Sequence, residues 1–207
     1  MAIYDLKAPF RDEDICALRI GDQVTLTGEA FTCRSKLQRT VFDENKKLPD
    51  RYRPIRTLIH TGPIVNVYQD RYELVSFMPT SSVRFEKWGA RSVREWNLQV
   101  IVGKTTMGPD TMAAMKAYHC VHLSPQSVSP NLWLDSIRIL GVNWFDEMGS
   151  IEAPWLLELN RLGPFVVDID TEGNNLFDEM DLHVQENKLN VYKSLGIPED
   201  FKPTKLH

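Results

Sequence analysis

The chain has only three cysteines among its 207 residues, Cys16, Cys33 and Cys120, and they lie far apart. An odd number of widely spaced cysteines excludes a dense disulfide framework and is typical of a reducing compartment. The spacing also lacks the compact pattern in which thiolates hold an iron–sulfur cluster. We therefore expect a cytoplasmic chain that binds no metal itself.

Long apolar runs, repeats and flexible Gly/Ser linkers are also missing. Residues 1–11 are interrupted by Asp5, Lys7 and Pro9 and lack the apolar segment of a secretory signal. No later stretch approaches the roughly 18 apolar residues of a membrane span. With 43% hydrophobic residues, the sequence predicts a single domain over residues 1–207 with a buried core and a loose tail from about residue 198.

The chain has little excess of charge, with 24 basic and 28 acidic residues and a net charge of −4. This balance gives no general reason to bind nucleic acid or a membrane surface. The distribution is uneven, because residues 1–108 hold 17 basic and 13 acidic residues whereas residues 109–207 hold 7 and 15. A site for an acidic substrate is therefore expected before residue 108.

Short β-branched or aromatic runs bounded by turn residues predict strands at 24–27, 57–60, 64–68, 72–77, 98–102, 120–123 and 165–169. Between the first two, segment 42–56 is rich in charge and proline, which predicts a surface loop or short helix that can face a partner. A helix is expected to open at Pro109, with Met112, Met115 and, at its end, His119 as candidates for one face. These elements predict an α/β fold.

A second helix is predicted over residues 174–195. Its apolar residues recur at helical spacing and form a single stripe, which we expect to pack in the core. The residues of this stripe are Phe177, Met180, Val184, Val191 and Leu195.

The run from Gly103 through Lys104 to Thr106 suggests a phosphate loop, but Leu98 occupies a position that must be glycine in that motif. The nucleotide interpretation therefore fails. A lysine on a tight turn remains, which can meet an anion or serve only the turn. His119 and His122 lack a nearby third ligand and do not predict a metal site.

Several predicted turns between strands combine cations with hydroxyls. Arginine binds a carboxylate through two hydrogen bonds, lysine supplies a point charge, and Thr80 and Ser81 place two hydroxyls after a proline. Together these turns can hold a small dicarboxylate. They comprise residues 27–28, 32–34, 60–64, 79–84 and 103–109, with Arg39 nearby.

At these turns, and again at residues 163–176, the sequence resembles the β subunit, or C-terminal domain, of class I iron–sulfur fumarate hydratases and L-tartrate dehydratases. The resemblance covers nearly the whole chain. It implies a swivelling β/β/α domain that pairs with a separate α subunit, whose three cysteines hold a [4Fe-4S] cluster with one open iron site. It further implies a heterotetramer of two α and two β chains that interconverts fumarate and malate or, as the next choice, dehydrates tartrate to oxaloacetate.

Site residues follow from the same resemblance. Arg34, Arg84 and Lys104 match the family's carboxylate-binding positions. Thr80 matches the threonine proposed as the base, and a hydroxyl can take that role only where neighbouring cations lower its pKa. Ser81 stands where the family usually has a second threonine and keeps the hydroxyl.

The chain departs from the family at several of these turns. Ser35 and Gln38 replace an acid and a histidine, Met78 replaces a glycine, and Thr105 and Thr106 replace two glycines. The family's stretch of small residues after the central helix is also altered, at 124–130. The substrate therefore stays open, and so does an alternative in which the chain is a non-catalytic dicarboxylate-binding or assembly subunit.

Overall fold

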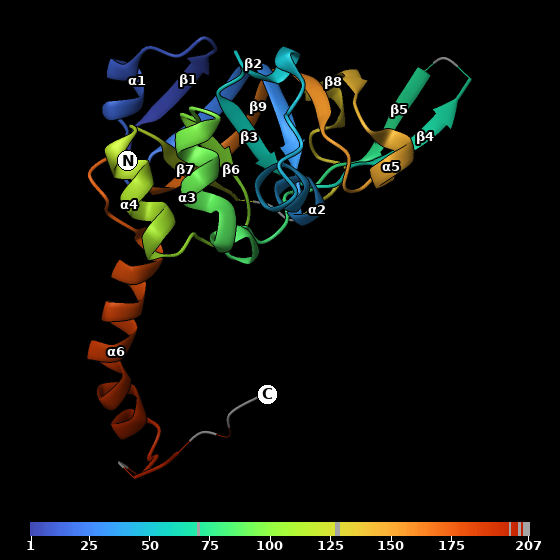
Figure 1. Ribbon diagram of the computed structural model, residues 1–207. Coiled ribbons are helices and arrows are strands. Elements are labelled where there is room, and N and C mark those ends of the chain that lie inside the picture. Colours follow the sequence, from blue (N-terminus) through green and yellow to red (C-terminus); the bar gives the residue numbers. More distant parts are fainter. Residues whose placement is uncertain (70, 127–128, 199, 203, 205–207) are drawn as a thin grey trace.

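The structure, a computed structural model, describes residues 1–69, 71–126, 129–198, 200–202 and 204. A seven-stranded mixed sheet, in the order β1-β2-β3-β6-β7-β9-β8, forms the body, and a two-stranded hairpin, β4-β5, extends from it (Figure 1). The α/β class predicted from the sequence is confirmed. Among the described residues, no helix combines the length and the apolar character needed to cross a bilayer.

The strands are β1 Ile3–Lys7, β2 Gln23–Cys33, β3 Thr57–His60, β4 Ile64–Tyr68, β5 Arg71–Ser76, β6 Val100–Val102, β7 Val121–Pro125, β8 Ile137–Val142 and β9 Trp155–Ile169. The α-helices are α1 Asp12–Cys16, α2 Ser35–Gln38, α3 Glu86–Glu95, α4 Pro109–Ala117, α5 Phe145–Met148 and α6 Leu176–Ser194. Short 3₁₀ turns occur at 50–52, 82–85 and 134–136, and a π turn at 39–43.

Strands β1, β2, β3, β6 and β7 run parallel to one another. The long strand β9 runs antiparallel to them and pairs with both β7 and β2. Strands β2, β3, β6, β7 and β9 therefore close into a ring. Because β2, β3, β6 and β7 are parallel, their carboxyl ends meet at the same edge of the ring.

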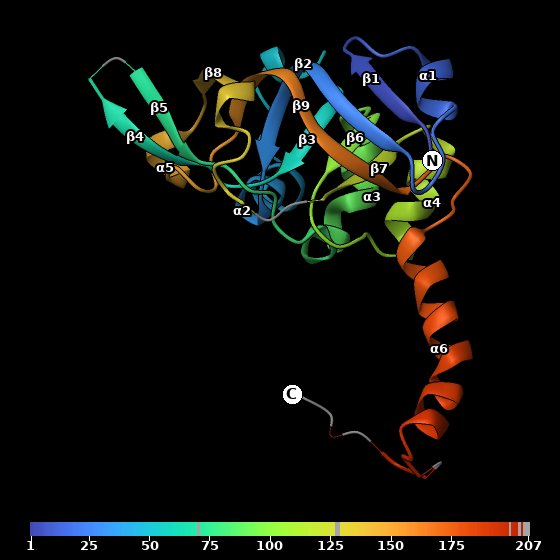
Figure 2. The same ribbon diagram turned by 180° about the vertical axis from the view of Figure 1, so that it is seen from behind.

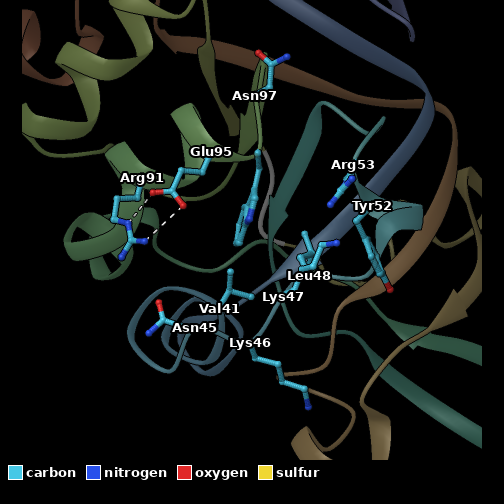
Figure 3. Close-up of a pocket in the computed structure, with 11 residues that line it drawn as sticks. Val41, Asn45, Lys46, Lys47, Leu48, Tyr52, Arg53, Arg91, Glu95 and Asn97 are labelled. Carbon is cyan, nitrogen blue, oxygen red and sulfur yellow. Dashed lines mark hydrogen bonds and ion pairs between the residues drawn. The ribbon is translucent and has the colours of Figure 1, made fainter.

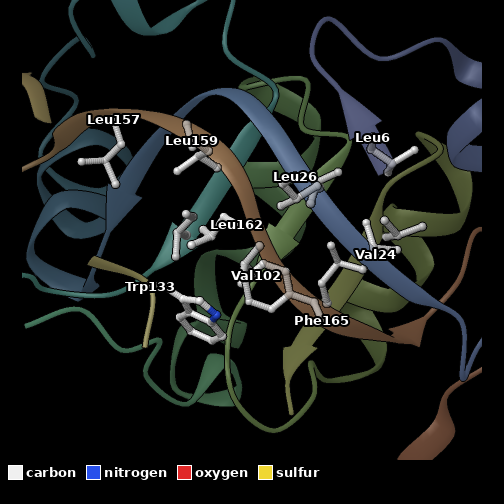
Figure 4. Packing of buried hydrophobic residues seen from close by; sticks show 14 of the residues in the cluster. Leu6, Val24, Leu26, Val102, Trp133, Leu157, Leu159, Leu162 and Phe165 are labelled. Atoms are coloured by element: carbon white, nitrogen blue, oxygen red, sulfur yellow. The ribbon is translucent and has the colours of Figure 1, made fainter. Parts of the chain in front are cut away.

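The core has two parts, because the central strands are covered on both faces. Inside the ring, Val24, Leu26 and Phe165 are buried together with Val102 (Figure 4). On the outer face Ile101 packs in a second cluster with residues of α3 and α4. This two-sided burial explains why residues 98–102 read as a continuous apolar run.

The predicted strands at 57–60 and 64–68 are confirmed with the same bounds, and the others are confirmed with shifted ends. Helix α3 was missed, because Trp88 and Val93 are its only large apolar side chains and set no clear period. Strands β1 and β8 were also missed. The helix at Pro109 is confirmed, but His119 lies beyond its end with a φ of 53° and is exposed.

The prediction that the stripe of α6 packs in the core is wrong. Helix α6 projects away from the body in both views of the molecule (Figures 1 and 2), and none of its residues is buried. The spacing predicted the helix correctly, but it does not say what the apolar side chains contact. Parts of two predicted segments, the tail from 198 and the stretch 124–130, lie outside the described residues, namely 199, 203, 205–207 and 127–128.

Candidate active site

The turns that carry the predicted site residues gather at the carboxyl ends of the parallel strands. Arg34 directly follows β2, Thr61 follows β3, and Gly103 and Lys104 follow β6. Strand pairing sets Cys33 beside His60 and Ile59 beside Val102. In open parallel sheets this edge is where ligands usually bind.

Residues 80–82 insert between the ends of β3 and β6 and continue the ladder there. The Thr80 N–H donates to the carbonyl of His60 (2.7 Å), and the Lys104 N–H donates to the carbonyl of Thr80 (2.9 Å). The Ser82 N–H in turn donates to the carbonyl of Lys104 (2.8 Å), and Ser81 forms a parallel bridge with Lys104. The backbones of Thr80, Ser81 and Lys104 are therefore held together as a unit.

The functional groups of this unit have no side-chain partners among the residues that the structure describes. Thr80, Ser81 and Lys104 are half-buried. Within the described part of the chain, neither hydroxyl makes a side-chain hydrogen bond, and the Lys104 ammonium has no carboxylate within ion-pair distance. A half-buried ammonium beside two unbonded hydroxyls is suited to an anionic ligand with several oxygen atoms.

Arg34 lies on the neighbouring strand end, but its guanidinium is engaged. Its Nε lies 3.1 Å from Oε1 of Glu152, and the side chain is 30% exposed. A side chain on Gly62 would bring its Cβ to 3.0 Å from Arg34 Cδ and 2.5 Å from Ile151, so the glycine makes room for the arginine. Arg34 is thus fixed over the turn that follows β3.

Arg84 lies on the 3₁₀ turn Ser82–Phe85 and is exposed. Its guanidinium makes no hydrogen bond or ion pair with any described residue. The structure therefore groups Thr80, Ser81 and Lys104 closely, sets Arg34 beside them, and leaves Arg84 on the outside of the same turn.

Sequence reasoning missed a buried network directly beneath this unit. The Ser82 hydroxyl lies 2.9 Å from His60 Nδ1 and 2.8 Å from His122 Nε2. His122 Nδ1 is 2.6 Å from Asp168 Oδ1, which also accepts from the Ser124 hydroxyl at 2.9 Å. Ser82, His122 and Asp168 are fully buried. The network joins the inserted turn to the interior of β7 and β9.

This network has the residue types of a hydrolytic triad, but no substrate can reach it, so it serves to position the turn. A hydroxyl has one proton, so Ser82 donates to one imidazole and accepts from the other. Burial, with a further contribution from His122, lowers the pKa of His60 well below its usual range and keeps the ring neutral. A Cβ on Gly103 would lie 1.8 Å from Ser82 Oγ, so only glycine fits there.

The sequence did contain a signal for this network. His122 and Asp168 each stand within a run that reads as a buried strand. A polar side chain in such a run must find a hydrogen-bond partner, since leaving it unpaired is costly. Two such residues on separate strands therefore predict an interaction.

The departures from the family fall in different surroundings. Gln38 is fully buried and donates to the Ser92 hydroxyl on α3 (3.0 Å), so this replacement belongs to helix packing. Ser35 is exposed at the start of α2. Thr105 adopts a φ of 63°, a conformation that favours glycine, and Thr106 accepts a hydrogen bond from Asn175, which caps α6.

A pocket of about 620 Å³ lies elsewhere, between segment 41–53 and the end of α3 (Figure 3). None of the predicted site residues lines it. Each of its four cations is near a carboxylate: Arg91 pairs with Glu95, Lys46 with Glu147, and Lys47 and Arg53 with Asp50. The pocket therefore gives no comparable argument for an anion site.

Fold and site together define an α/β domain with a cation and hydroxyl cluster at the carboxyl ends of its parallel strands. Comparison with known families gives a match to the family described as Fumarase C-terminus over residues 2–180. The chain belongs to this family.

The relatives are named as subunits or enzymes of two related kinds. The chain is 32% identical over 175 residues to the "L(+)-tartrate dehydratase subunit beta" of Escherichia coli (strain K12), covering 84% of this chain and 86% of that protein. It is 33% identical to the "Putative L(+)-tartrate dehydratase subunit beta" of Methanocaldococcus jannaschii, covering 86% and 92%. It is 27% identical to the "Putative fumarate hydratase class I" of Geobacillus stearothermophilus, covering 92% of this chain and 36% of that protein.

Proposed function

We propose that this chain is the β subunit of a hydro-lyase that adds or removes water across a C4 dicarboxylate. The observation that carries the proposal is the unit of Thr80, Ser81 and Lys104 at the strand ends, held together through its backbone, whose side chains have no polar partner among the described residues. The names of the relatives agree with this chemistry. The domain is then of the swivelling β/β/α kind, acting in the cytoplasm.

Dehydration of a hydroxy diacid removes a weakly acidic proton from the carbon next to a carboxylate. Negative charge develops on that carboxylate, so a preorganised cation lowers the barrier. Lys104 is placed for this role, with Arg34 and Arg84 as further carboxylate contacts and Ser81 as a hydrogen-bond donor. Thr80 is the proposed base, because a neighbouring ammonium favours the ionised form of its hydroxyl.

The departing hydroxyl must be activated by a Lewis acid, and the cysteines of this chain are not suited to hold an iron–sulfur cluster for that purpose. Burial raises the pKa of the Cys33 and Cys120 thiols, with Glu152 adding to the effect at Cys33. Neutral buried thiols are poor cluster ligands. We assign the [4Fe-4S] cluster, and with it the Lewis-acid chemistry, to an α subunit in an assembly of two α and two β chains.

Turnover by the assembled complex tests the proposal. The complex is prepared anaerobically and incubated with L(+)-tartrate or L-malate, and oxaloacetate or fumarate is measured. Tartrate comes first because the identities to tartrate dehydratase subunits, 32% and 33%, exceed the 27% to the fumarate hydratase. We expect Lys104→Met to lower kcat/KM strongly and Lys104→Arg to restore part of the loss, because arginine keeps the positive charge.

If the intact complex turns over neither diacid but binds one of them in a way that depends on Lys104, the chain is a non-catalytic dicarboxylate-binding subunit and the proposal is wrong. If Lys104→Met leaves turnover unchanged, then Thr80, Ser81 and Lys104 are not the substrate site of the reaction.

A further inference from the structure

The apolar stripe of α6 is exposed along its whole length. Its members, which we call the arm stripe, are Phe177, Met180, Val184, Val191 and Leu195, with exposures of 42%, 48%, 59%, 48% and 69%. Single exposed apolar residues are ordinary, but an aligned row of five on a projecting helix marks an interaction surface. The stripe residues follow one another at steps of three, four, seven and four residues, and the step of seven passes over Asn187 and Lys188.

The stripe does not fold back onto the body. Asn175 caps the helix by accepting from the Phe177 N–H (2.9 Å) and is tied to Thr106, so the first turn is anchored in the direction in which the helix leaves (Figures 1 and 2). The family match ends at residue 180, so Val184, Val191 and Leu195 lie beyond the matched domain. The stripe is thus separate from the strand-end site, and the inference does not depend on the proposed function.

Four of the five stripe residues fit the heptad repeat of two packed helices, with Asn187 and Ser194 at the intermediate positions of the later heptads. Phe177, Val184 and Val191 are seven residues apart, and Met180 occupies the intermediate position of the first heptad. Such a seam is narrow and suits another helix better than a flat surface. At about 1.5 Å per residue, the 19 residues of α6 offer a seam of about 28 Å.

The charges of α6 indicate which helix that is. Asp181 in its first half and Lys188 in its second half flank the arm stripe at about 100° per residue, whereas the other charged side chains of the helix lie toward its far side. Two copies of α6 running in opposite directions bring Asp181 of each beside Lys188 of the other. Parallel copies would oppose acid to acid, and the two helix dipoles would also be aligned unfavourably.

We propose that α6 is a dimerisation arm that pairs antiparallel with α6 of a second copy of this chain. With Met180 opposite Val191 of the second copy, Phe177 lies near Leu195 and Asp181 near Lys188 of that copy. The contact is isologous, as expected of a two-fold dimer. A seam of one helix pair is at the small end of specific interfaces, so we expect a dissociation constant on the order of micromolar for the chain alone.

Sedimentation velocity of the full chain tests the pairing. Between about 1 and 100 μM the average mass should rise from that of the 23.8 kDa monomer toward twice this value. Val184→Asp with Val191→Asp should hold the chain monomeric throughout. Leu182→Asp with Leu189→Asp is the matched control, because these exposed residues have the same spacing on another side of the same helix; it should dimerise like the unaltered chain.

Cross-linking tests the direction. In a Cys16→Ser background, where the other cysteines are buried, Val184→Cys should cross-link to itself because it lies near the two-fold axis. Phe177→Cys should not, because antiparallel pairing puts the two Phe177 positions at opposite ends. A chain that stays monomeric at 100 μM, equal loss of pairing in both aspartate variants, or cross-linking of Phe177→Cys would each overturn the proposal.

Discussion

The body of the molecule, built on the seven-stranded sheet, buries leucine side chains, whereas the arm formed by α6 exposes them. In the body Leu26 and Leu162 are fully buried, and even the polar His122 and Asp168 are enclosed and hydrogen-bonded. On the arm Leu182 and Leu189 are 65% and 64% exposed. The difference shows that apolar periodicity specifies a helix or strand, whereas burial is decided by which elements the topology brings over it.

The largest effect should come from breaking the buried pair in the body. His122→Ala leaves Asp168 without its imidazole and should lower the free energy of unfolding by about 3–5 kcal/mol. The exposed pair of Arg138 with Glu158 provides the control, since Arg138→Ala should cost under about 1 kcal/mol. Urea unfolding of both variants measures the difference. Equally small losses of unfolding free energy in His122→Ala and Arg138→Ala would mean that the buried network stabilises the body no more than an exposed ion pair does.

Matched leucine truncations compare the two regions directly. Leu162→Ala should cost about 2–5 kcal/mol because it leaves a cavity inside the ring. Leu189→Ala should change the free energy of unfolding by less than about 0.5 kcal/mol, because the side chain is already in water. Unfolding is followed at concentrations well below the micromolar dissociation constant expected for the arm, where the chain is monomeric. A comparable loss at Leu189 would show that the arm packs on the body.

The pH dependence of stability tests the role of the neutral His60 in the buried network. Because burial lowers the pKa of His60 in the folded state, the unfolded chain binds more protons below its usual pKa of about 6.5, and stability falls as the pH drops through that value. The slope is at most about 1.4 kcal/mol per pH unit from this group. Urea unfolding from pH 7.5 to 5.0 should show the slope reduced in His60→Asn. Identical slopes would exclude His60 as the source.

The smallest expected effect is at the rim of the site. Thr105 holds a backbone conformation that costs a β-branched residue about 1–2 kcal/mol, so Thr105→Gly should stabilise the body by under about 1 kcal/mol once the greater freedom of unfolded glycine is included. The neighbouring Thr106→Gly should destabilise it, because Thr106 accepts from Asn175. Thermal unfolding measures the stability of both variants. A loss of stability in Thr105→Gly as well as in Thr106→Gly would show that the backbone conformation of Thr105 is not strained.

Much of the fold was predictable from local patterns. The strands ending at His60 and Val102 have the apolar runs and turn residues that the sequence makes visible, and the shared edge of parallel strands follows from them. The ring was not predictable, because it depends on β9 pairing both with β7 and with β2, which lies more than a hundred residues earlier in the sequence. No local pattern encodes such a closure.

The turns that carry the candidate site were predictable from the sequence, but the buried hydrogen-bond network beneath them was not. The turns with Thr80 and Lys104 could be found from their residue types, and the structure hydrogen-bonds them together. That Ser82 faces inward between two imidazoles follows only from the three-dimensional arrangement. Likewise Gln38, which stands in place of a family histidine, proves to be bonded inside the helix layer.

The most direct test of the central claim is the turnover of the assembled complex with a change at Thr80. We expect Thr80→Ala to lower kcat by about 10²-fold or more, which is the usual contribution of a general base, and Thr80→Ser to stay within about tenfold of the unaltered chain because it keeps the hydroxyl. Size-exclusion chromatography confirms that each variant assembles. A fully assembled Thr80→Ala complex whose kcat remains within a few-fold would contradict the account.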